Sequence, residues 1–490
     1  VADPRISPDG KWVAYVVEEN DLDTDEQRSR IYMTSIDGAE TIAMTGETYS
    51  AYEPRWTPDG KRLSFIAARD DLDESAASQV YTLDLRGGEA AAYTNVPQGV
   101  DEHAWAPAGG RLLLAIRDES AAQKAARLAR ENGESEPLLP VVIDRLQFKE
   151  DGVGYLDRSR RHYYVQEGRL DEAKQLTFGD YDDYEGAWSP DGARIAFASN
   201  RTNEPDGNVN TDIWTAEIGR AGKAHPPSRV TDNPGTDATP SWSPDGRLIA
   251  YSTQLDPKLF WYASAHLAVA PAEGGPARVL TEPLDRFFYK PRFSPDGREI
   301  FAAYEHDGEQ PLVAVNIETG AKRDVIAGEI AVFDFDVHPS GLVAARMGRA
   351  DLPEEVFVSS GAEARRITRT NDALLKAVTL SKPFTAKVKS KDGTEVEAFF
   401  YPPTKGRTKK APTILRIHGG PTSQFDFSFD AYAQLYAASG YAVVMVNPRG
   451  STGYGTNFAA AIYADWGEKD FDDVMAGVDH AIAIGLADPK

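Results

Sequence analysis

The stretch WSPDGARIAFA, residues 188–198, joins a tight turn to an alternating strand. In its Pro-Asp-Gly core the proline fixes φ, the aspartate side chain offers a hydrogen-bond acceptor, and the glycine can adopt a positive φ. The residues that follow, RIAFAS over 194–199, alternate in the way that is typical of a half-buried strand. We therefore predict a turn that leads directly into a strand.

The same turn-and-strand pattern occurs seven times in the first three quarters of the chain, mostly about fifty residues apart. A further apolar strand usually follows, as in QVYTLDL (79–85) and DIWTAEI (212–218). Several short strands per unit, repeated seven times, predict an all-β, seven-bladed propeller over residues 1–375. A β-sandwich would not repeat with this period. The other six copies are ISPDGKWVAYV (6–16), WTPDGKRLSFI (56–66), WAPAGGRLLLAI (105–116), WSPDGRLIAYS (242–252), FSPDGREIFAA (293–303) and the degenerate VHPSGLVAARM (337–347).

An insertion separates the third and fourth copies, which lie about eighty residues apart. Residues 118–135, DESAAQKAARLARENGES, have a helical composition with mixed charge. Two interpretations are open: a solvated helix on the rim of the propeller, or an insertion that gates access to a cavity. Residues 143–165 then return to the alternation that predicts strands.

From about residue 376 the repeat disappears and a mixed α/β pattern begins. Two strands are predicted around a Lys-Asp-Gly turn within 377–403, and buried strands at APTIL (411–415) and YAVVMVN (441–447). Helices are predicted over 429–440, 456–467 and 469–488. This alternation implies a largely parallel sheet covered by helices. We expect residues 376–490 to form the N-terminal part of an α/β-hydrolase domain.

Taken in order, several motifs resemble the prolyl oligopeptidase family of serine peptidases, most of all its acylaminoacyl-peptidase and bacterial dipeptidyl-peptidase branch. They are the SPDG turns, HGGP (418–421), NPRGSTGYG (447–455) and DWGEKDFDD (465–473). The resemblance implies a propeller that caps the active site of an α/β-hydrolase domain and restricts entry to short peptides. It also implies a Ser-His-Asp triad, in which histidine deprotonates the serine and aspartate orients the histidine.

The chain departs from the family in its catalytic residues. The family serine lies in a Gly-x-Ser-x-Gly turn, and this sequence contains none. Ser451 has Arg449 where the first glycine should be, so it is not a nucleophile of that kind. None of the catalytic triad is therefore expected in this chain. We expect the triad to lie after Lys490, in a C-terminal hydrolase segment of the same precursor, and the chain alone to be inactive.

What remains of the site can be carried over residue by residue. Gly420 matches the family position whose backbone N–H helps to bind the oxyanion, and the residues that shape its turn are His418, Gly419 and Pro421. A plain strand-to-helix turn is the alternative for this motif. Arg449 and Tyr454 match a loop beside the active site, where they are either structural or substrate-lining. His418 is not expected to be the general base, because the family histidine follows the nucleophile.

Composition excludes several classes of function. A net charge of −23 argues against nucleic acid and against an anionic membrane surface. The absence of cysteine removes disulfides, thiolate metal sites and cysteine nucleophiles, but leaves the compartment open. No His-x-x-x-His pair supports a zinc peptidase, so no metal or cofactor is expected. The acidic stretches DEH (101–103) and DYDDYE (180–185) could hold a cation or a peptide's ammonium group, or could be solvated loops.

The sequence thus predicts a serine exopeptidase or oligopeptidase that hydrolyses short peptides near the N-terminus, with acylaminoacyl or dipeptidyl release left open. The alternatives are a catalytically inactive propeller that binds ligands, and an esterase with the same fold. The periplasm is the compartment that the resemblance favours, with the cytoplasm possible. S1 specificity and oligomeric state are not predicted.

Overall fold

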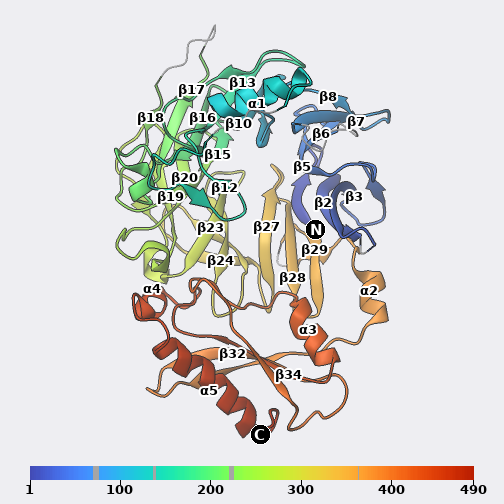
Figure 1. Cartoon of the computed structure of the whole chain (residues 1–490), viewed down its shortest axis with the longest axis vertical. Coiled ribbons are helices and arrows are strands. Elements are labelled where there is room, and N and C mark those ends of the chain that lie inside the picture. The colour runs from blue at the N-terminus through green and yellow to red at the C-terminus, as the bar shows by residue number, and fades with distance from the viewer. Residues whose placement is uncertain (22, 70–76, 136–139, 220–225, 362) are drawn as a thin grey trace.

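The computed structural model describes residues 1–21, 23–69, 77–135, 140–219, 226–361 and 363–490. Its first part contains seven four-stranded antiparallel sheets, here called sheets 1 to 7 in chain order (Figure 1). Sheets 1 to 4 are β1 (Ala2–Ile6), β2 (Trp12–Asp21), β3 (Glu26–Ser35), β4 (Thr41–Ala43); β5 (Ala51–Trp56), β6 (Arg62–Ala67), β7 (Gln79–Asp84), β8 (Ala91–Ala92); β9 (Glu102–Trp105), β10 (Leu112–Arg117), β13 (Arg161–Gln166), β14 (Lys174–Gln175); and β15 (Asp183–Trp188), β16 (Arg194–Ser199), β17 (Asp212–Glu217), β18 (Ser228–Arg229). Sheets 5 to 7 are β19 (Asp237–Trp242), β20 (Leu248–Thr253), β21 (His266–Pro271), β22 (Arg278–Val279); β23 (Phe287–Phe293), β24 (Glu299–Glu305), β25 (Leu312–Asn316), β26 (Lys322–Ile326); and β27 (Ala331–Val337), β28 (Val343–Arg349), β29 (Leu352–Ser359), β30 (Arg365–Arg366).

The predicted turn joins the first two strands of each sheet, and its chemistry is visible in sheet 4. The Ser189 hydroxyl donates to Asp191 Oδ1 at 2.6 Å, and the same oxygen accepts the Ala193 N–H at 3.0 Å. Gly192 lies at φ +64°, where a side chain is disfavoured. The prediction of a Pro-Asp-Gly turn leading into a strand is confirmed. The same Ser/Thr–Asp contact occurs at Ser7/Asp9, Thr57/Asp59, Ser243/Asp245 and Ser294/Asp296.

The sheets form a closed ring, because each contacts the next and sheet 7 contacts sheet 1. At the closing junction, the Ile6 N–H donates to Asp336 Oδ2 at 2.8 Å. Val13 and Tyr15 of sheet 1 pack there with Val356 of sheet 7. The apolar core of this part of the molecule is therefore divided among the junctions between neighbouring sheets.

The insertion leaves sheet 3 between β10 and β13. It contains α1 (Ala121–Glu131) and a small hairpin of β11 (Lys149–Glu150) and β12 (Gly154–Tyr155). The helix begins at Ser120, whose side chain and that of Gln123 form a reciprocal cap, and its side chains are mostly exposed. This agrees with the solvated-helix interpretation.

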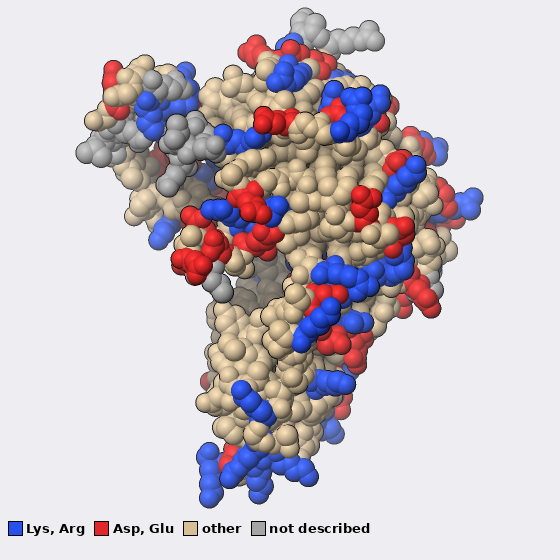
Figure 2. All heavy atoms as spheres, turned by 90° about the vertical axis from the view of Figure 1, so that its right-hand side faces the viewer, with Lys and Arg blue, Asp and Glu red and all other residues tan. Residues whose placement is uncertain are grey.

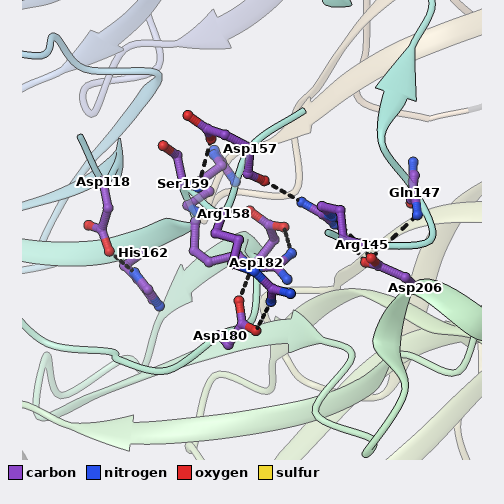
Figure 3. Close-up of polar contacts among 12 residues, drawn as sticks. Asp118, Arg145, Gln147, Asp157, Arg158, Ser159, His162, Asp180, Asp182 and Asp206 are labelled. Atoms are coloured by element: carbon purple, nitrogen blue, oxygen red, sulfur yellow. Dashed lines mark hydrogen bonds and ion pairs between the residues drawn. The ribbon is translucent and has the colours of Figure 1, made fainter. Parts of the chain in front are cut away.

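The prediction of strands throughout 143–165 was wrong for much of that stretch. Side-chain ion pairs position part of it instead (Figure 3). The Arg145 guanidinium binds both oxygens of Asp206 at 3.0 and 2.6 Å. Arg158 Nε lies 3.0 Å from Asp144. Alternation in a single segment could not predict these partners, because Asp206 follows sixty-one residues later.

The C-terminal sheet has the order β31-β32-β34-β33, from β31 (Phe384–Lys389), β32 (Glu395–Tyr401), β33 (Thr413–Arg416) and β34 (Ala442–Asn447). The predicted hairpin around Lys-Asp-Gly is β31 and β32. The prediction of a largely parallel sheet was wrong, because only β33 and β34 pair in parallel. A short hairpin turn can join only antiparallel strands.

Burial separates the two strands that were predicted to lie inside. Every residue of β34 is buried, as predicted. The residues of β33 are only half-buried, because β33 forms an edge of the sheet among the described residues, and Ile417 directly after it is 64% exposed. The prediction of a buried strand at 411–415 was therefore wrong.

Three helices accompany this sheet: α3 (Ala431–Ala438), α4 (Thr456–Ala459) and α5 (Lys469–Ala483). A Cβ on Gly477 of α5 would lie 2.4 Å from Val446, so the glycine allows the close contact between α5 and β34. The helix predicted over 456–467 ends early, in the 3-10 turn η5 (Ala460–Ile462). Elsewhere there are α2 (Asp372–Ala377) and the 3-10 turns η1 (Pro205–Gly207), η3 (Phe260–Tyr262) and η4 (Glu282–Leu284).

Charged side chains are sparse over one face of the narrow C-terminal part, in the lower half of Figure 2. Tyr432 and Leu435 of α3 are 63% and 59% exposed. In the described part of the chain, no helix combines the length and apolar character needed to cross a membrane.

Candidate active site

The HGGP turn directly follows β33. Gly420 lies at φ +131°, and a Cβ there would sit 2.7 Å from the Thr422 backbone nitrogen, so this position requires glycine. Gly420 is exposed, and its N–H finds no acceptor among the described residues. The turn therefore presents a free backbone donor at the end of a strand, which is what an oxyanion-binding position needs.

His418 and Ser451 are brought together, with His418 Nε2 at 2.9 Å from Ser451 Oγ. The Ser451 hydroxyl also contacts the Pro448 carbonyl oxygen at 2.7 Å, and the residue is fully buried. Burial lowers the pKa of His418, which favours the neutral imidazole. Despite its histidine neighbour, Ser451 is closed off from a substrate here, because no part of it reaches the surface. The contact instead ties the HGGP turn to the loop after β34.

Arg449 is held by two carboxylates. Its guanidinium nitrogens lie 2.9 and 2.7 Å from the oxygens of Asp473, and Nη1 lies 2.5 Å from Asp392. Its side chain is 8% exposed and that of Asp473 is fully buried. These contacts raise the pKa of Arg449. With its donors engaged inside the domain, Arg449 fits the structural interpretation better than the substrate-lining one.

Tyr454 also takes part in an internal network. Its hydroxyl donates to Glu397 Oε2 at 2.6 Å and accepts from Asn447 Nδ2 at 2.8 Å. The Asn447 amide in turn contacts the backbone N–H and carbonyl of Phe425 at 2.7 and 2.8 Å. One side chain at the end of β34 thus fixes both the loop after the HGGP turn and the loop that carries Tyr454.

Sequence reasoning missed the polar groups where the ring meets this site. Buried side-chain atoms of Glu305, Gln424 and Thr452 have no hydrogen-bond partner among the described residues. Burial raises the pKa of Glu305 to about 7. The only local signal is a glutamate at the end of a strand pattern, and nothing in the sequence shows that residues 424 and 452 lie near it.

A second set of contacts links the ring to the C-terminal domain. Asp285 accepts the Thr456 N–H at 3.0 Å, the Thr456 hydroxyl at 2.7 Å and the Ser264 hydroxyl at 2.8 Å. The indole N–H of Trp466, in the DWG motif, donates to the Tyr262 hydroxyl at 2.7 Å. The DWG motif and the residue that directly follows NPRGSTGYG therefore contact the ring of sheets.

Carboxylates of the two acidic stretches form ion pairs with arginines. Asp101 and Glu102 pair with Arg161 at 3.5 and 2.8 Å. Asp180 and Asp182 pair with Arg160 at 2.7 and 3.0 Å. The side chains of Asp101, Glu102 and Asp180 remain about half exposed, so they are solvated as well as paired with arginine, and of these four carboxylates only Asp182 is mostly buried.

Comparison with known proteins shows which family this chain is similar to. Residues 427–490 match the model of the prolyl oligopeptidase family. The "uncharacterized peptidase YuxL" of Bacillus subtilis (strain 168) is 30% identical over 381 residues, which cover 72% of this chain and 55% of that protein. This chain is related to the prolyl oligopeptidase family. Dipeptidyl-peptidase 5 of Porphyromonas gingivalis is 29% identical over 327 residues, covering 64% of this chain and 46% of the relative. The chain spans about half the length of these curated relatives.

Solved structures show the fold that this relationship implies. The acylaminoacyl peptidase of Pyrococcus horikoshii superimposes with a TM-score of 0.81 at 21% identity, over 99% of this chain and 71% of that one. A puromycin-hydrolyzing peptidase of Mycobacterium tuberculosis gives 0.70 at 18% identity, over 100% and 72%. Neighbours of this kind combine a β-propeller with an α/β-hydrolase domain. The predicted fold class is confirmed at that level, and so is the resemblance to the prolyl oligopeptidase family.

Proposed function

We propose that this chain is the larger part of a serine peptidase that acts on short peptides and removes acylated or free N-terminal residues. The observation that carries the proposal is the N–H of Gly420, an exposed residue in the turn after β33, for which the described residues offer no acceptor. The names of the relatives support the same class of reaction, because they include a dipeptidyl-peptidase and an acylaminoacyl peptidase.

In this proposal the seven sheets are the seven blades of a propeller over residues 1–375, and residues 376–490 begin the α/β-hydrolase domain. A segment after Lys490 supplies serine, histidine and aspartate. The Gly420 N–H and the N–H after that serine then bind the oxyanion of the tetrahedral intermediate. One such donor is typically worth about 3–4 kcal/mol in the transition state. His418, Gly419 and Pro421 hold this turn in place, while Arg449 and Tyr454 hold the neighbouring loop.

The test uses the longer polypeptide that includes the residues after Lys490. We expect it to react with a fluorophosphonate and to hydrolyse aminoacyl p-nitroanilides. Comparison of acetyl-alanyl and alanyl-alanyl p-nitroanilide then separates acylaminoacyl from dipeptidyl release. Hydrolysis of p-nitrophenyl esters alone would identify an esterase. Absence of both labelling and hydrolysis would leave the inactive, ligand-binding propeller.

Gly419→Ala and Gly420→Ala form a matched pair for the oxyanion role. A Cβ on Gly419 meets nothing within 4 Å, whereas a Cβ on Gly420 meets the Thr422 backbone. We expect Gly420→Ala to lower kcat by 100-fold or more and Gly419→Ala to change it little. Equal kcat values in the two variants would show that Gly420 does not belong to the oxyanion site.

A further inference from the structure

A cavity of about 260 Å³ lies inside the ring, lined by residues from several different sheets. Its charged lining residues are Arg5, Glu53, Arg55, Glu102, Arg292 and Asp336. Four of these six groups are held in ion pairs among the described residues, either with one another or with neighbouring side chains. Arg55 pairs with Glu53 at 3.2 Å and with Asp3 at 2.6 Å, and Glu102 pairs with Arg161 at 2.8 Å.

A short motif repeated in three sheets explains how these arginines reach the cavity. It reads Asp-Pro-Arg at residues 3–5, Glu-Pro-Arg at 53–55 and Lys-Pro-Arg at 290–292. In each copy the first residue lies at positive φ (+49°, +58° and +54°), and the strand pairing shifts there as in a β-bulge. The arginine Nη1 then donates to the carbonyl of the preceding proline, at 3.3, 2.8 and 2.8 Å.

The third copy differs from the others in its first residue. In the first two copies that residue is acidic and pairs with the arginine of its own motif, Asp3 with Arg5 and Glu53 with Arg55. Lys290 takes its place in the third copy, and its ammonium group binds Asp334 at 3.1 Å instead. Among the described residues, no carboxylate lies within 4 Å of the Arg292 guanidinium.

The surroundings of Arg292 leave its charge poorly compensated. Burial, and then the positive charge of Arg5, lower the pKa of Arg292. Asp336 and Glu185 are also without a cation within 4 Å in the described structure, and each accepts a backbone N–H, from Ile6 and Thr239. The cavity thus offers the guanidinium of Arg292 and, separately, the carboxylate of Asp336, which can accept N–H groups.

We propose that Arg292 binds the C-terminal carboxylate of a short peptide inside the ring of sheets. A guanidinium holds a carboxylate through two parallel N–H···O bonds, and Arg292 has donors free for them. The peptide's own N–H groups face the carboxylate of Asp336, which lines the cavity. A phosphate dianion fits less well, because it brings no donor for that acid and is repelled by it. This binding does not depend on the proposed peptidase activity.

The test measures binding to residues 1–490 by calorimetry, with trialanine and trialanine amide as probes. The two peptides differ only in the terminal carboxylate. We expect trialanine to bind at least tenfold more tightly than the amide. Arg292→Gln should remove this difference, while Arg298→Gln, an exposed arginine of the adjoining turn, should preserve it. Equal binding of the two peptides to the unmodified chain, or an unchanged preference in Arg292→Gln, would overturn the proposal.

A second variant tests the motif without removing the guanidinium. Lys290→Glu recreates the Glu-Pro-Arg of residues 53–55, so its carboxylate should neutralise Arg292 and weaken trialanine binding at least tenfold. If Arg292→Gln fails to fold, Lys290→Glu and the comparison of trialanine with trialanine amide still test the proposal. Inorganic phosphate that displaces trialanine and binds more tightly than it would identify a general anion site and overturn the assignment to a peptide.

Discussion

The ring of sheets and the C-terminal domain are stabilised by polar contacts of opposite kinds. In the ring, a serine or threonine bonds an aspartate two residues later, and this contact recurs in five sheets. In the C-terminal domain, Arg449 binds Asp473 and Asp392, which lie 24 and 57 residues away, and the contact occurs once. The ring therefore repeats one small local contact from sheet to sheet, whereas the Arg449 contact of the C-terminal domain joins segments that lie far apart in the sequence.

The largest loss of stability is expected when Arg449 is removed. Arg449→Met leaves the fully buried Asp473 without its cation, so we expect the free energy of unfolding of this domain to fall by about 3–5 kcal/mol. Urea unfolding measures the change. Arg298→Met, at an exposed position in the ring, is the control and should stay within about 0.5 kcal/mol. Similar losses for the two variants would erase the contrast between the regions.

A smaller effect is expected where the two regions meet. Asp285 lies at φ +44°, so Asp285→Gly removes the carboxylate without adding backbone strain. The Thr456 N–H and two hydroxyls then lose their acceptor, which should cost about 1–3 kcal/mol. Hydrogen exchange at the Thr456 amide should accelerate. Asp285→Asn keeps one acceptor oxygen, so its exchange rate should lie between those of the unmodified protein and Asp285→Gly. An unchanged exchange rate in Asp285→Gly would show that this contact does not hold the regions together.

Within the ring, the loss of one hydrogen-bonded turn should reduce stability less than the loss of the Asp285 contacts. Ser243→Ala removes a hydroxyl that donates to Asp245 at 2.7 Å and accepts the Leu248 N–H at 2.9 Å. We expect a loss of about 1 kcal/mol, and a similar loss for Ser189→Ala and for Ser294→Ala. Because the three turns lie in different sheets, the losses should add in a triple variant. Unequal or non-additive losses in thermal unfolding would show that the repeats are not independent units.

The smallest expected effect is on how the stability of the folded state depends on pH. Hydrogen bonds from Ser243 and Arg247 lower the pKa of Asp245 from 3.8 to about 2. The folded state therefore binds fewer protons than the unfolded state between these values, so this turn loses stability as the pH falls from about 4 through about 2. Asp245→Asn keeps the acceptor oxygen but cannot titrate. Its unfolding midpoint should fall less steeply over this range, and parallel pH profiles would contradict the assignment.

Local chemistry was predictable from the sequence, and long-range pairing was not. The Ser-Pro-Asp-Gly turns and the hairpin around Lys-Asp-Gly are determined within a few residues, so their sequence alone predicts them. The edge position of β33 depends on β34 pairing with both β32 and β33, which no local pattern records. The early end of α4 was missed for the same reason, because Thr456 and Trp466 are held by the ring.

The candidate site divides in the same way. The requirement for glycine at position 420 follows from a turn that the adjacent residues of the HGGP motif predict. The partners of Arg449 and Tyr454 come from other segments, and the contact of His418 with Ser451 joins two loops thirty-three residues apart. The oxyanion role of Gly420 remains a prediction until the paired glycine variants are measured.

The ring has a mechanical consequence at its closing junction. Six junctions join sheets that follow one another along the chain, whereas every described hydrogen bond between sheets 1 and 7 involves a side chain. The contacts at this junction include the apolar cluster of Val13 and Val356, the bond from the Ile6 N–H to Asp336, and the bonds from Arg365 to the carbonyls of Ile36 and Asp37. A force that separates β1 from β30 would load this seam directly. Under such a force, sheets 1 and 7 would separate without the loss of a strand-to-strand hydrogen bond within any sheet.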